Sequence, residues 1–396
     1  MSYLIFCSFE VGGFPFRMAK TLNRFGVETY YIYLGNIRSG HDSTQFHHGN
    51  RFEKWDFSNL FQDILGNPKK IIERLSQIKK LHKISHCLAT GMAAYYLIKA
   101  GINYKYWSYG ADIDDQYFIR VDMKKNQISW RPIKNPYRMW NERRKTRNSI
   151  IRADSVMISP YQQEAFTKIC INKKMFFLPH FFKIIDYQVL LQQKAQNKRT
   201  VCEEIRAERY FFSSTRHVWA GPLRNLIDNK GNNIMLNSYA IFKKITVDDH
   251  SKLVLVKKGP DVELSKSLSR RLGIEDDVVW IDEMKREELD RYYQGAAICF
   301  GQFGTPVVTY AALEPLANGT ISISFLNDNN SPVPFYKEKP PIFSNINPKE
   351  IAEFMVKKLA EEKDYEDLSY NSWLWIQNNC SEEIFVKSFL TLFQEA

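Results

Sequence analysis

The strongest constraint on the fold of this chain is a repeated alternation of short apolar runs with longer amphipathic stretches. Short apolar runs bounded by turn residues are typical of buried strands, and the amphipathic stretches have helical spacing. The alternation predicts parallel sheets covered by helices. The expected strands lie at 3–8, 27–33, 85–89, 104–108, 154–158, 174–178, 209–213, 252–257, 277–281, 296–300 and 320–325. The expected helices lie at 15–25, 68–80, 91–100, 137–152, 160–168, 231–244, 260–273, 285–294, 308–317 and 347–361.

The alternation is interrupted once and then restarts, so we predict an α/β protein with two Rossmann-like, doubly wound domains facing across a cleft. We expect a first domain at 1–182, a linker with a helix at 183–207 and a second domain at 208–364. A helical tail at 365–396 is expected to pack back toward the first domain. The polar stretch 113–136 predicts a long loop.

Composition and charge narrow the possible partners. Lysine and arginine total 55 of the 396 residues against 44 aspartate and glutamate, which gives a net charge of +11. Such an excess favours phosphate, nucleic acid or an anionic membrane surface. No segment approaches the roughly 18 consecutive apolar residues of a membrane span, and the first residues lack a signal-peptide pattern. The six cysteines show no metal-ligand spacing, so we expect a cytoplasmic protein without a zinc site.

A first candidate motif is the glycine pair Gly12-Gly13, between the first expected strand and a helix. Glycines at this place let the backbone approach a ligand, and the helix N-terminus offers N–H groups to an anion. The alternative is a plain turn between strand and helix.

Basic residues follow the first strand of the second domain. Arg216 stands just after that strand, and Lys230 opens the next helix. Two cations and helix N–H groups at one point suit a diphosphate. Arg224 is a rival for the role of Arg216, and a solvated basic loop is the alternative to a binding site.

A glycine-rich loop with Gln302, Gly304 and Thr305 follows a later strand and precedes a helix that carries Glu314 among Ala and Leu. A carboxylate in an apolar helix is costly without a partner. A ribose diol, which offers two hydroxyl donors, is one such partner, and a structural arginine is the other.

In their order these motifs resemble the nucleotide-sugar-binding half of GT-B glycosyltransferases, specifically family 4 of the retaining enzymes, from Tyr210 to near Trp375. In that family an Arg after the first strand and the Lys of a Lys-Gly pair bind the donor diphosphate, and they match Arg216 and Lys230. The family's ribose-holding Glu matches Glu314. The resemblance implies a retaining transfer that needs no metal and no cofactor besides the nucleotide-sugar co-substrate.

The chain departs from the family at the first acid of the E-x7-E pattern. Pro306 stands eight residues before the ribose-binding Glu, and an alignment on the Phe-Gly pair puts Gly301 there instead. Gln302, or backbone N–H groups around Gly304 and Thr305, could substitute for the missing acid near the transferred sugar.

The first domain resembles the family more weakly, through a stretch similar to its H-G-x-D-I motif. Tyr109 stands in the place of the His, and Asp112 is a candidate for contacting the acceptor or the transferred sugar. A turn cap is the alternative role for Asp112. Asp112 and Asp114 also form a D-x-D, which binds a metal in GT-A enzymes, but two predicted sheet domains disfavour that interpretation.

A basic stretch over residues 131–147 has seven Lys or Arg against one acid. Its interleaved aromatic residues suit the interface of an anionic membrane, or an anionic acceptor. A solvated helix face is the alternative. The residues assigned to this surface are Arg138, Trp140, Arg143 and Arg144.

The resulting hypothesis is a cytoplasmic glycosyltransferase, peripheral at the inner face of a membrane. It moves a hexose-type sugar from a nucleotide diphosphate donor to a carbohydrate or lipid-linked acceptor, in bacterial surface polysaccharide or lipopolysaccharide synthesis. One alternative is an inactive GT-B-like scaffold or regulatory subunit, motivated by the missing acid. The other is a nucleic-acid-binding protein, but no helix-turn-helix, RNA-recognition or zinc motif supports it.

Overall fold

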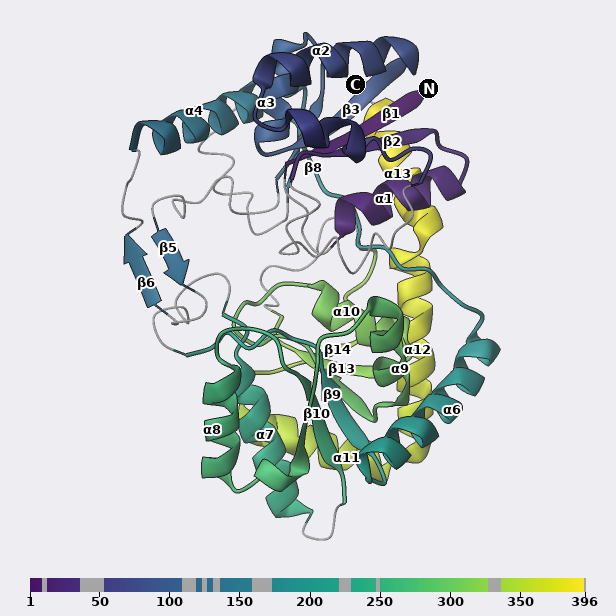
Figure 1. Cartoon of the computed structure of the whole chain (residues 1–396). Helices are drawn as coiled ribbons and strands as arrows, with labels where there is room; N and C mark the ends of the chain where they lie inside the picture. The colour runs from purple at the N-terminus through teal and green to yellow at the C-terminus, as the bar shows by residue number, and fades with distance from the viewer. Residues whose placement is uncertain are drawn as a thin grey trace. The chain divides into compact units, whose positions relative to one another are not determined.

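The structure is a computed structural model that divides into two compact units. Unit 1 comprises Met1–Arg120, Trp130–Pro179 and Glu382–Ala396, and unit 2 comprises Val121–Ser129 and His180–Ser381. Each unit has a six-stranded sheet, so the predicted α/β class with two doubly wound domains is confirmed (Figure 1). The described residues are 1–8, 13–35, 53–108, 119–122, 127–130, 136–158, 173–220, 229–246, 250–326 and 336–394.

The sheet of unit 1 has the strand order β2-β1-β3-β4-β7-β8, and its strand pairs are parallel. All six residues of β1 are buried, because this strand lies inside the sheet and is covered on both faces. The strands are β1 (Ser2–Cys7), β2 (Thr29–Tyr33), β3 (Ile84–Thr90), β4 (Lys105–Trp107), β7 (Val156–Met157) and β8 (Met175–Phe176).

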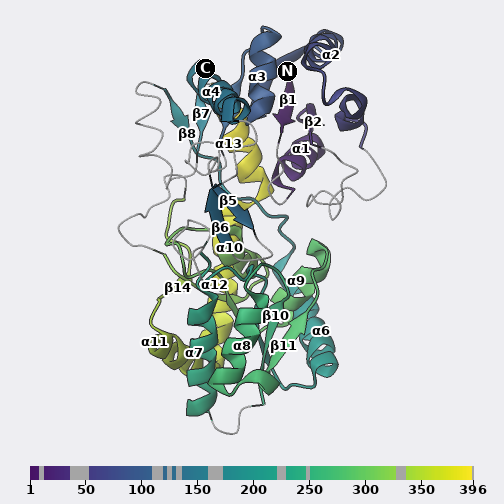
Figure 2. The same cartoon turned by 60° about the vertical axis from the view of Figure 1, so that its left-hand side comes forward.

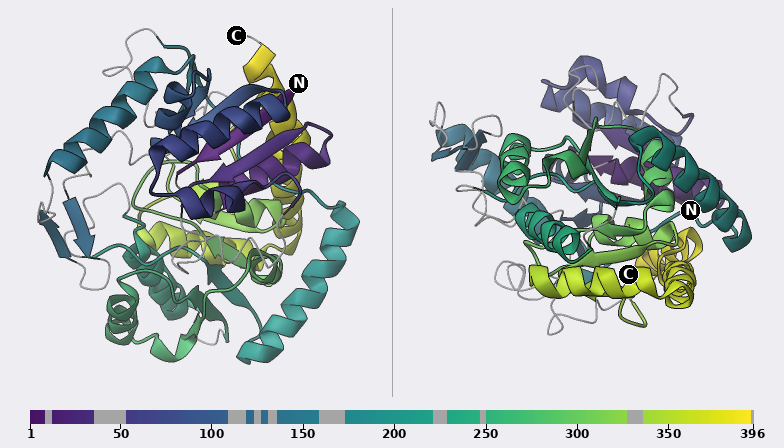
Figure 3. Two further views of the ribbon diagram at one scale, coloured as in Figure 1. Left: turned by 45° about the horizontal axis from the view of Figure 1, so that its top comes forward. Right: turned by 90° about the horizontal axis from the view of Figure 1, so that it is seen from below.

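Helices cover both faces of this sheet, as Figure 3 shows for α2 and α13 on opposite sides of the β1 strand. The helix α2 (Pro68–Leu81) packs on α3 (Met92–Lys99), and α4 (Pro136–Arg152) packs on α3 in turn. On the other face, α1 (Phe14–Arg24) contacts α13 (Glu382–Gln394).

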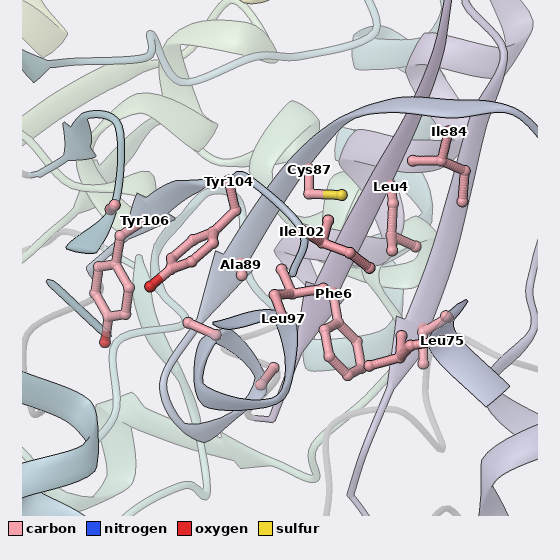
Figure 4. Packing of buried hydrophobic residues seen from close by; sticks show 14 of the residues in the cluster. Leu4, Phe6, Leu75, Ile84, Cys87, Ala89, Leu97, Ile102, Tyr104 and Tyr106 are labelled. Atoms are coloured by element: carbon pink, nitrogen blue, oxygen red, sulfur yellow. The ribbon is translucent and has the colours of Figure 1, made fainter. Parts of the chain in front are cut away.

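The core of unit 1 joins β1 to the α2 and α3 layer. Leu4 and Phe6 of β1 point toward Leu75 of α2 and Leu97 of α3 (Figure 4). The opposite face is closed by α13, because the ring of Tyr3 contacts those of two phenylalanines of that helix. The ring-centroid distances are 5.4 Å to Phe389 and 5.2 Å to Phe393.

The sheet of unit 2 has the order β11-β10-β9-β12-β13-β14, and all its pairs are parallel. The strands are β9 (Tyr210–Ser213), β10 (Lys252–Val256), β11 (Val278–Ile281), β12 (Ile298–Phe300), β13 (Ile321–Ser324) and β14 (Ile342–Ser344). One face carries α7 (Asn232–Ile245), α8 (Val262–Leu272) and α11 (Pro348–Ala360). The other carries α6 (Tyr187–Ile205), α9 (Arg286–Gly295), α10 (Tyr310–Ala317) and α12 (Glu362–Cys380), as Figures 1 and 2 show.

Three features differ from the expectations. Residues 113–136, expected as a loop, contain the strand pair β5 (Ile119–Asp122) and β6 (Gln127–Trp130). The strand β14 and the 3-10 helix η2 (Ser58–Ile64) were not expected, because their short runs lack a clear hydrophobic period. The expected helix at 160–168 lies outside the described residues.

The segments expected as linker and tail are helical. The 183–207 segment contains α6, which is part of unit 2 and packs on α9. The tail consists of two helices, α12 in unit 2 and α13 in unit 1. Among the described helices, none has both the length and the apolar character needed to cross a bilayer.

Candidate functional site

The sheet of unit 2 has its topological switch point between the neighbouring strands β9 and β12. From β9 the chain runs through α7 to β10 on one side, whereas β12 continues to β13 on the other side. Ligands of open α/β sheets bind at such a point, beyond the carboxyl ends of the strands. Here that edge carries the loop 214–220 after β9 and the loop 301–309 after β12. Two of the predicted motifs therefore meet at the switch point.

The loop that carries Arg216 is fixed to the turn after β10. The His217 backbone N–H donates to the Lys258 carbonyl at 2.6 Å, and the Asp261 N–H donates to the His217 carbonyl at 3.1 Å. The Asp261 carboxylate accepts from the N–H groups of Trp219 and Ala220 at 2.7 and 2.8 Å. Three residues of the loop backbone are thus held by one buried acid and two main-chain bonds.

Gly259 in that turn permits the close approach. Its φ is +106°, and a Cβ there would lie 2.5 Å from the His217 carbonyl oxygen and 2.7 Å from Cγ of Arg216. Because L residues rarely adopt this φ and the space is filled, only glycine fits. The turn therefore fixes the start of the Arg216 side chain.

Lys230 lies between the two loops of the switch point. Its N–H donates to the Val218 carbonyl at 2.7 Å, and its own carbonyl accepts from the Phe303 N–H at 2.9 Å. Gly231 follows with φ +64° and caps the N-terminus of α7. The structure thus brings the backbones of Lys230, the Arg216 loop and the glycine-rich loop together, next to a helix N-terminus.

The glycine-rich loop is held by its own contacts. The Gln302 carbonyl accepts from the Ser324 hydroxyl at 2.7 Å and from the Phe325 N–H at 2.9 Å, and its side-chain amide donates to the Thr305 carbonyl at 3.4 Å. Gly304 lies against the turn that precedes α7, since a Cβ there would lie 2.2 Å from the Asn229 carbonyl oxygen. Gln302 is therefore buried in the loop, where its amide is engaged with Thr305.

Glu314 lies in α10 and is 8 % exposed. One carboxylate oxygen pairs with the Arg286 guanidinium, and the other accepts from the Tyr293 hydroxyl at 2.6 Å. Burial alone would lower the pKa of Arg286, but the charges of Glu314 and Asp290 outweigh it and raise that pKa. The structural arginine considered as one partner of Glu314 is thus present, together with a tyrosine that the sequence did not single out.

His217 is a further buried residue of this edge, and its sequence position predicted no function for it. It is fully buried, its Nδ1 is 2.8 Å from the Ser265 hydroxyl, and its ring lies 5.1 Å from that of Trp280. Burial lowers the pKa of His217 to about 4. A neutral imidazole therefore supports the loop that carries Arg216.

The remaining predicted residues are elsewhere or outside the described part. Gly13 caps α1 of unit 1 with φ +69°. In α4, Trp140 is 51 % exposed, and the Arg144 guanidinium lies 5.3 Å from its ring. The side chains of Arg138 and Arg143 in the same helix lie outside the described part. So do the residues Gly12, Tyr109, Asp112 and Arg224.

No group of three or more His, Cys, Asp or Glu residues that could hold a metal ion occurs within the described ranges. The D-x-D at 112–114 lies outside those ranges. The described part of the switch-point edge is built from cations, backbone N–H groups and two carboxylates, of which Asp261 is bonded to the loop backbone and Glu314 is paired with Arg286. This donor set suits an anion with hydroxyl groups.

Comparisons with known proteins agree with this architecture. No protein-family model and no curated protein matches the sequence. A glycosyltransferase from Rickettsia africae ESF-5 is similar in structure, with a TM-score of 0.63 and 12% identity over 100% of this chain and 97% of that one. Anabaena Alr3699/HepE in complex with UDP has a TM-score of 0.63 and 10% identity over 100% of both chains. Sucrose-phosphate synthase from Thermosynechococcus elongatus has a TM-score of 0.60 and 12% identity over 100% and 98%.

These likenesses establish that the chain has the GT-B fold. At such low identity they concern the fold, and one fold supports many reactions. The membership of family 4 stays a prediction from the motifs.

Proposed function

We propose that this protein is a glycosyltransferase that moves a hexose-type sugar from a nucleotide diphosphate-sugar to a carbohydrate or lipid-linked acceptor. The observation that carries the proposal is the junction at the switch point of unit 2. There the Arg216 loop, Lys230-Gly231 and the glycine-rich loop are joined by main-chain hydrogen bonds beside the N-terminus of α7. One structural neighbour that is named a glycosyltransferase, and a second that is in complex with UDP, support the same activity.

In the proposed reaction the bond between the anomeric carbon and the diphosphate oxygen breaks, and a bond to the acceptor oxygen forms. The acceptor proton passes to the departing phosphate, so the protein needs no separate base. Arg216, Lys230 and the N–H groups at the start of α7 stabilise the charge that develops on the diphosphate. Each charge-assisted hydrogen bond contributes about 1.5–3 kcal/mol. We propose that this set makes the transfer metal-independent, and that the transfer retains the anomeric configuration, as in the resembling family.

Transfer from a panel of nucleotide sugars tests the proposal, with Lys230→Ala and Glu314→Ala compared with the wild type. The control is Lys349→Ala, an exposed lysine of α11 paired with Glu353 at 3.8 Å. We expect both site variants to lose activity by tenfold or more, and the control to keep it. Full activity in both site variants would overturn the site. Nucleotide binding without any transfer would favour the scaffold alternative, which the lack of an acid in the 301–309 loop motivates.

The proposal for the acceptor is based on the basic and aromatic surface formed by α3 and α4. Trp140 is exposed beneath Arg144, and the ring of Tyr95 lies 4.6 Å from the Lys145 ammonium and 5.8 Å from that of Lys99. Aromatic rings flanked by cations suit an anionic lipid interface. We propose that this surface contacts an anionic membrane at its cytoplasmic face, in surface polysaccharide or lipopolysaccharide synthesis.

Vesicle sedimentation tests the membrane proposal. We expect binding to vesicles with anionic lipids, weaker binding to neutral ones, and a loss of binding in Trp140→Ala. Equal binding to both vesicle types, or none, would contradict it.

A further inference from the structure

A continuous chain of hydrogen bonds connects three elements of unit 2 through Glu314. Ser214 at the end of β9 contacts the hydroxyl of Tyr293 in α9, and that hydroxyl contacts the carboxylate of Glu314 in α10. Arg286, at the start of α9, pairs with the other carboxylate oxygen. Arg286 and Tyr293 are seven residues apart on one helix, so they lie on the same face two turns apart. Both oxygens of the Glu314 carboxylate, which is proposed to bind the nucleotide-sugar, are therefore contacted by side chains of the same helix, α9.

The direction of these bonds follows from the chemistry of the groups. Tyr293 is 2 % exposed, and burial together with the charge of Glu314 raises the pKa of its hydroxyl well above the usual range. The hydroxyl stays protonated, and its single hydrogen goes to the carboxylate, which can only accept. Ser214 therefore donates to the Tyr293 oxygen. Each link of the chain thus strengthens the next toward Glu314.

The carboxylate keeps capacity for a ligand after these contacts. An ionised carboxylate has about four acceptor positions, two on each oxygen. Within the described residues each oxygen of Glu314 receives one donor, from Arg286 or from Tyr293. One acceptor position on each oxygen is left by the described residues, and the positions of both protein donors fix where these point. Two adjacent hydroxyl groups match such a pair of positions.

We propose that Tyr293 and Arg286 are positioning residues that aim Glu314 at the 2′- and 3′-hydroxyls of a ribose and thereby select ribonucleoside over 2′-deoxyribonucleoside diphosphates. The inference rests on the proposed function, because it assigns the nucleotide to the edge that carries Glu314. A 2′-deoxyribose supplies one hydroxyl fewer, so one aimed and largely buried acceptor position loses its donor. A buried polar group without a partner disfavours binding.

Arg286 also makes the buried charge of Glu314 tolerable. A carboxylate at 8 % exposure needs a paired cation, and removal of one member of a buried pair leaves the other uncompensated. The Arg286 guanidinium is itself held over the Phe182 ring at 5.8 Å. Its planar donors fix the carboxylate in one plane, which the point charge of a lysine does less well.

The chain offers closely matched controls. Tyr292, the neighbour of Tyr293, is also buried, but its hydroxyl accepts from Arg291 at 3.3 Å and not from the Glu314 network. Arg291 on the same helix pairs with Glu204 of α6 at 2.8 Å. The test variants are Tyr293→Phe, Arg286→Lys and Arg286→Met, and the controls are Tyr292→Phe and Arg291→Met.

The experiment is isothermal titration with UDP, GDP and ADP and with their 2′-deoxy forms. For the nucleotide that binds, we expect the wild type to prefer the ribose form by about tenfold or more. Tyr293→Phe and Arg286→Met should reduce this ratio at least threefold, Arg286→Lys should keep part of it, and both controls should keep it fully. If Tyr293 and Arg286 only stabilise the fold, their variants should have lower melting temperatures but the same preference for ribose as the wild type.

The outcomes separate the inference from the proposed function. If the wild type binds no nucleoside diphosphate, both are wrong. If it binds one but does not distinguish ribose from deoxyribose, the inference alone is overturned. An unchanged preference for ribose over deoxyribose in Tyr293→Phe also overturns the inference. Because this change removes only the hydroxyl group, the variant is expected to stay folded.

Discussion

The substitution Gly231→Ala probes the junction on which the account of the site depends. Gly231 has φ +64°, and a Cβ there would lie 2.8 Å from Cβ of Phe303 and 2.9 Å from the backbone nitrogen of Gly304. The variant therefore meets two separate costs. One is the left-handed conformation of a non-glycine residue, about 1 kcal/mol. The other is the clash with the glycine-rich loop, which we estimate at about 1–3 kcal/mol from overpacked cores.

Gly273 separates these two costs. It follows α8 with φ +72°, close to that of Gly231, but no atom of the described residues lies within 4 Å of its notional Cβ. Gly273→Ala should therefore lower the free energy of unfolding only by the cost of the left-handed conformation. The difference between the two variants measures how tightly the Lys230-Gly231 turn packs against the glycine-rich loop.

Urea unfolding gives the free energy of unfolding of both variants, and thermal shifts with nucleoside diphosphates give their binding. We expect Gly231→Ala to be less stable than Gly273→Ala by about 1–3 kcal/mol and to lose most of the nucleotide-induced shift. Equal destabilisation of the two variants, with nucleotide binding retained in both, would refute the close packing at the switch point.

Three further predictions concern residues that support the fold and the site. Burial lowers the pKa of His217 to about 4, below the 6.5 of the unfolded chain, so the unfolded state takes up the proton first. The contribution of His217 to stability should be complete above pH 6.5 and decrease as the pH falls toward 4, and urea midpoints of His217→Gln should lack this part of the pH dependence. Asp261→Ala should cost about 2–4 kcal/mol in urea unfolding and weaken nucleotide binding, because the N–H groups of Trp219 and Ala220 lose their acceptor. Phe389→Ala should lower stability by about 3–5 kcal/mol, because α13 closes one face of the unit 1 sheet, whereas unchanged calorimetry of this variant would contradict that packing.

The fold could be predicted from the sequence because most core strands are short apolar runs that are recognisable without knowledge of their partners. Residues 253–256 of β10 are buried throughout, and this run of apolar residues predicts a strand. The strand β14 (Ile342–Ser344) is shorter and lies at the sheet edge, where only pairing with β13 defines it. The β5 and β6 pair likewise depends on partners, so the polar sequence of 113–136 indicates a loop instead. Tertiary pairing overrides local pattern in both cases.

The site was partly accessible for a similar reason. Lys230 and the glycine-rich loop stand directly after strands or before helices, and the parallel topology places such residues at one edge. The partners of Glu314 are separated from it by 28 and 21 residues, on another helix. Only the packing of α9 against α10 brings them together. Arg286 has the ordinary sequence signal of a surface helix, so its pairing required the structure.

We expect a nucleoside diphosphate to bind at the switch-point edge of unit 2. Hydrogen–deuterium exchange of the whole chain, with and without UDP, GDP or ADP, locates the bound nucleotide. We predict slower exchange at 214–220, 229–234 and 301–313 for the nucleotide that binds, with little change at the start of the same strands. Slower exchange confined to other segments, or no change with any of the three nucleotides, would contradict binding at this edge.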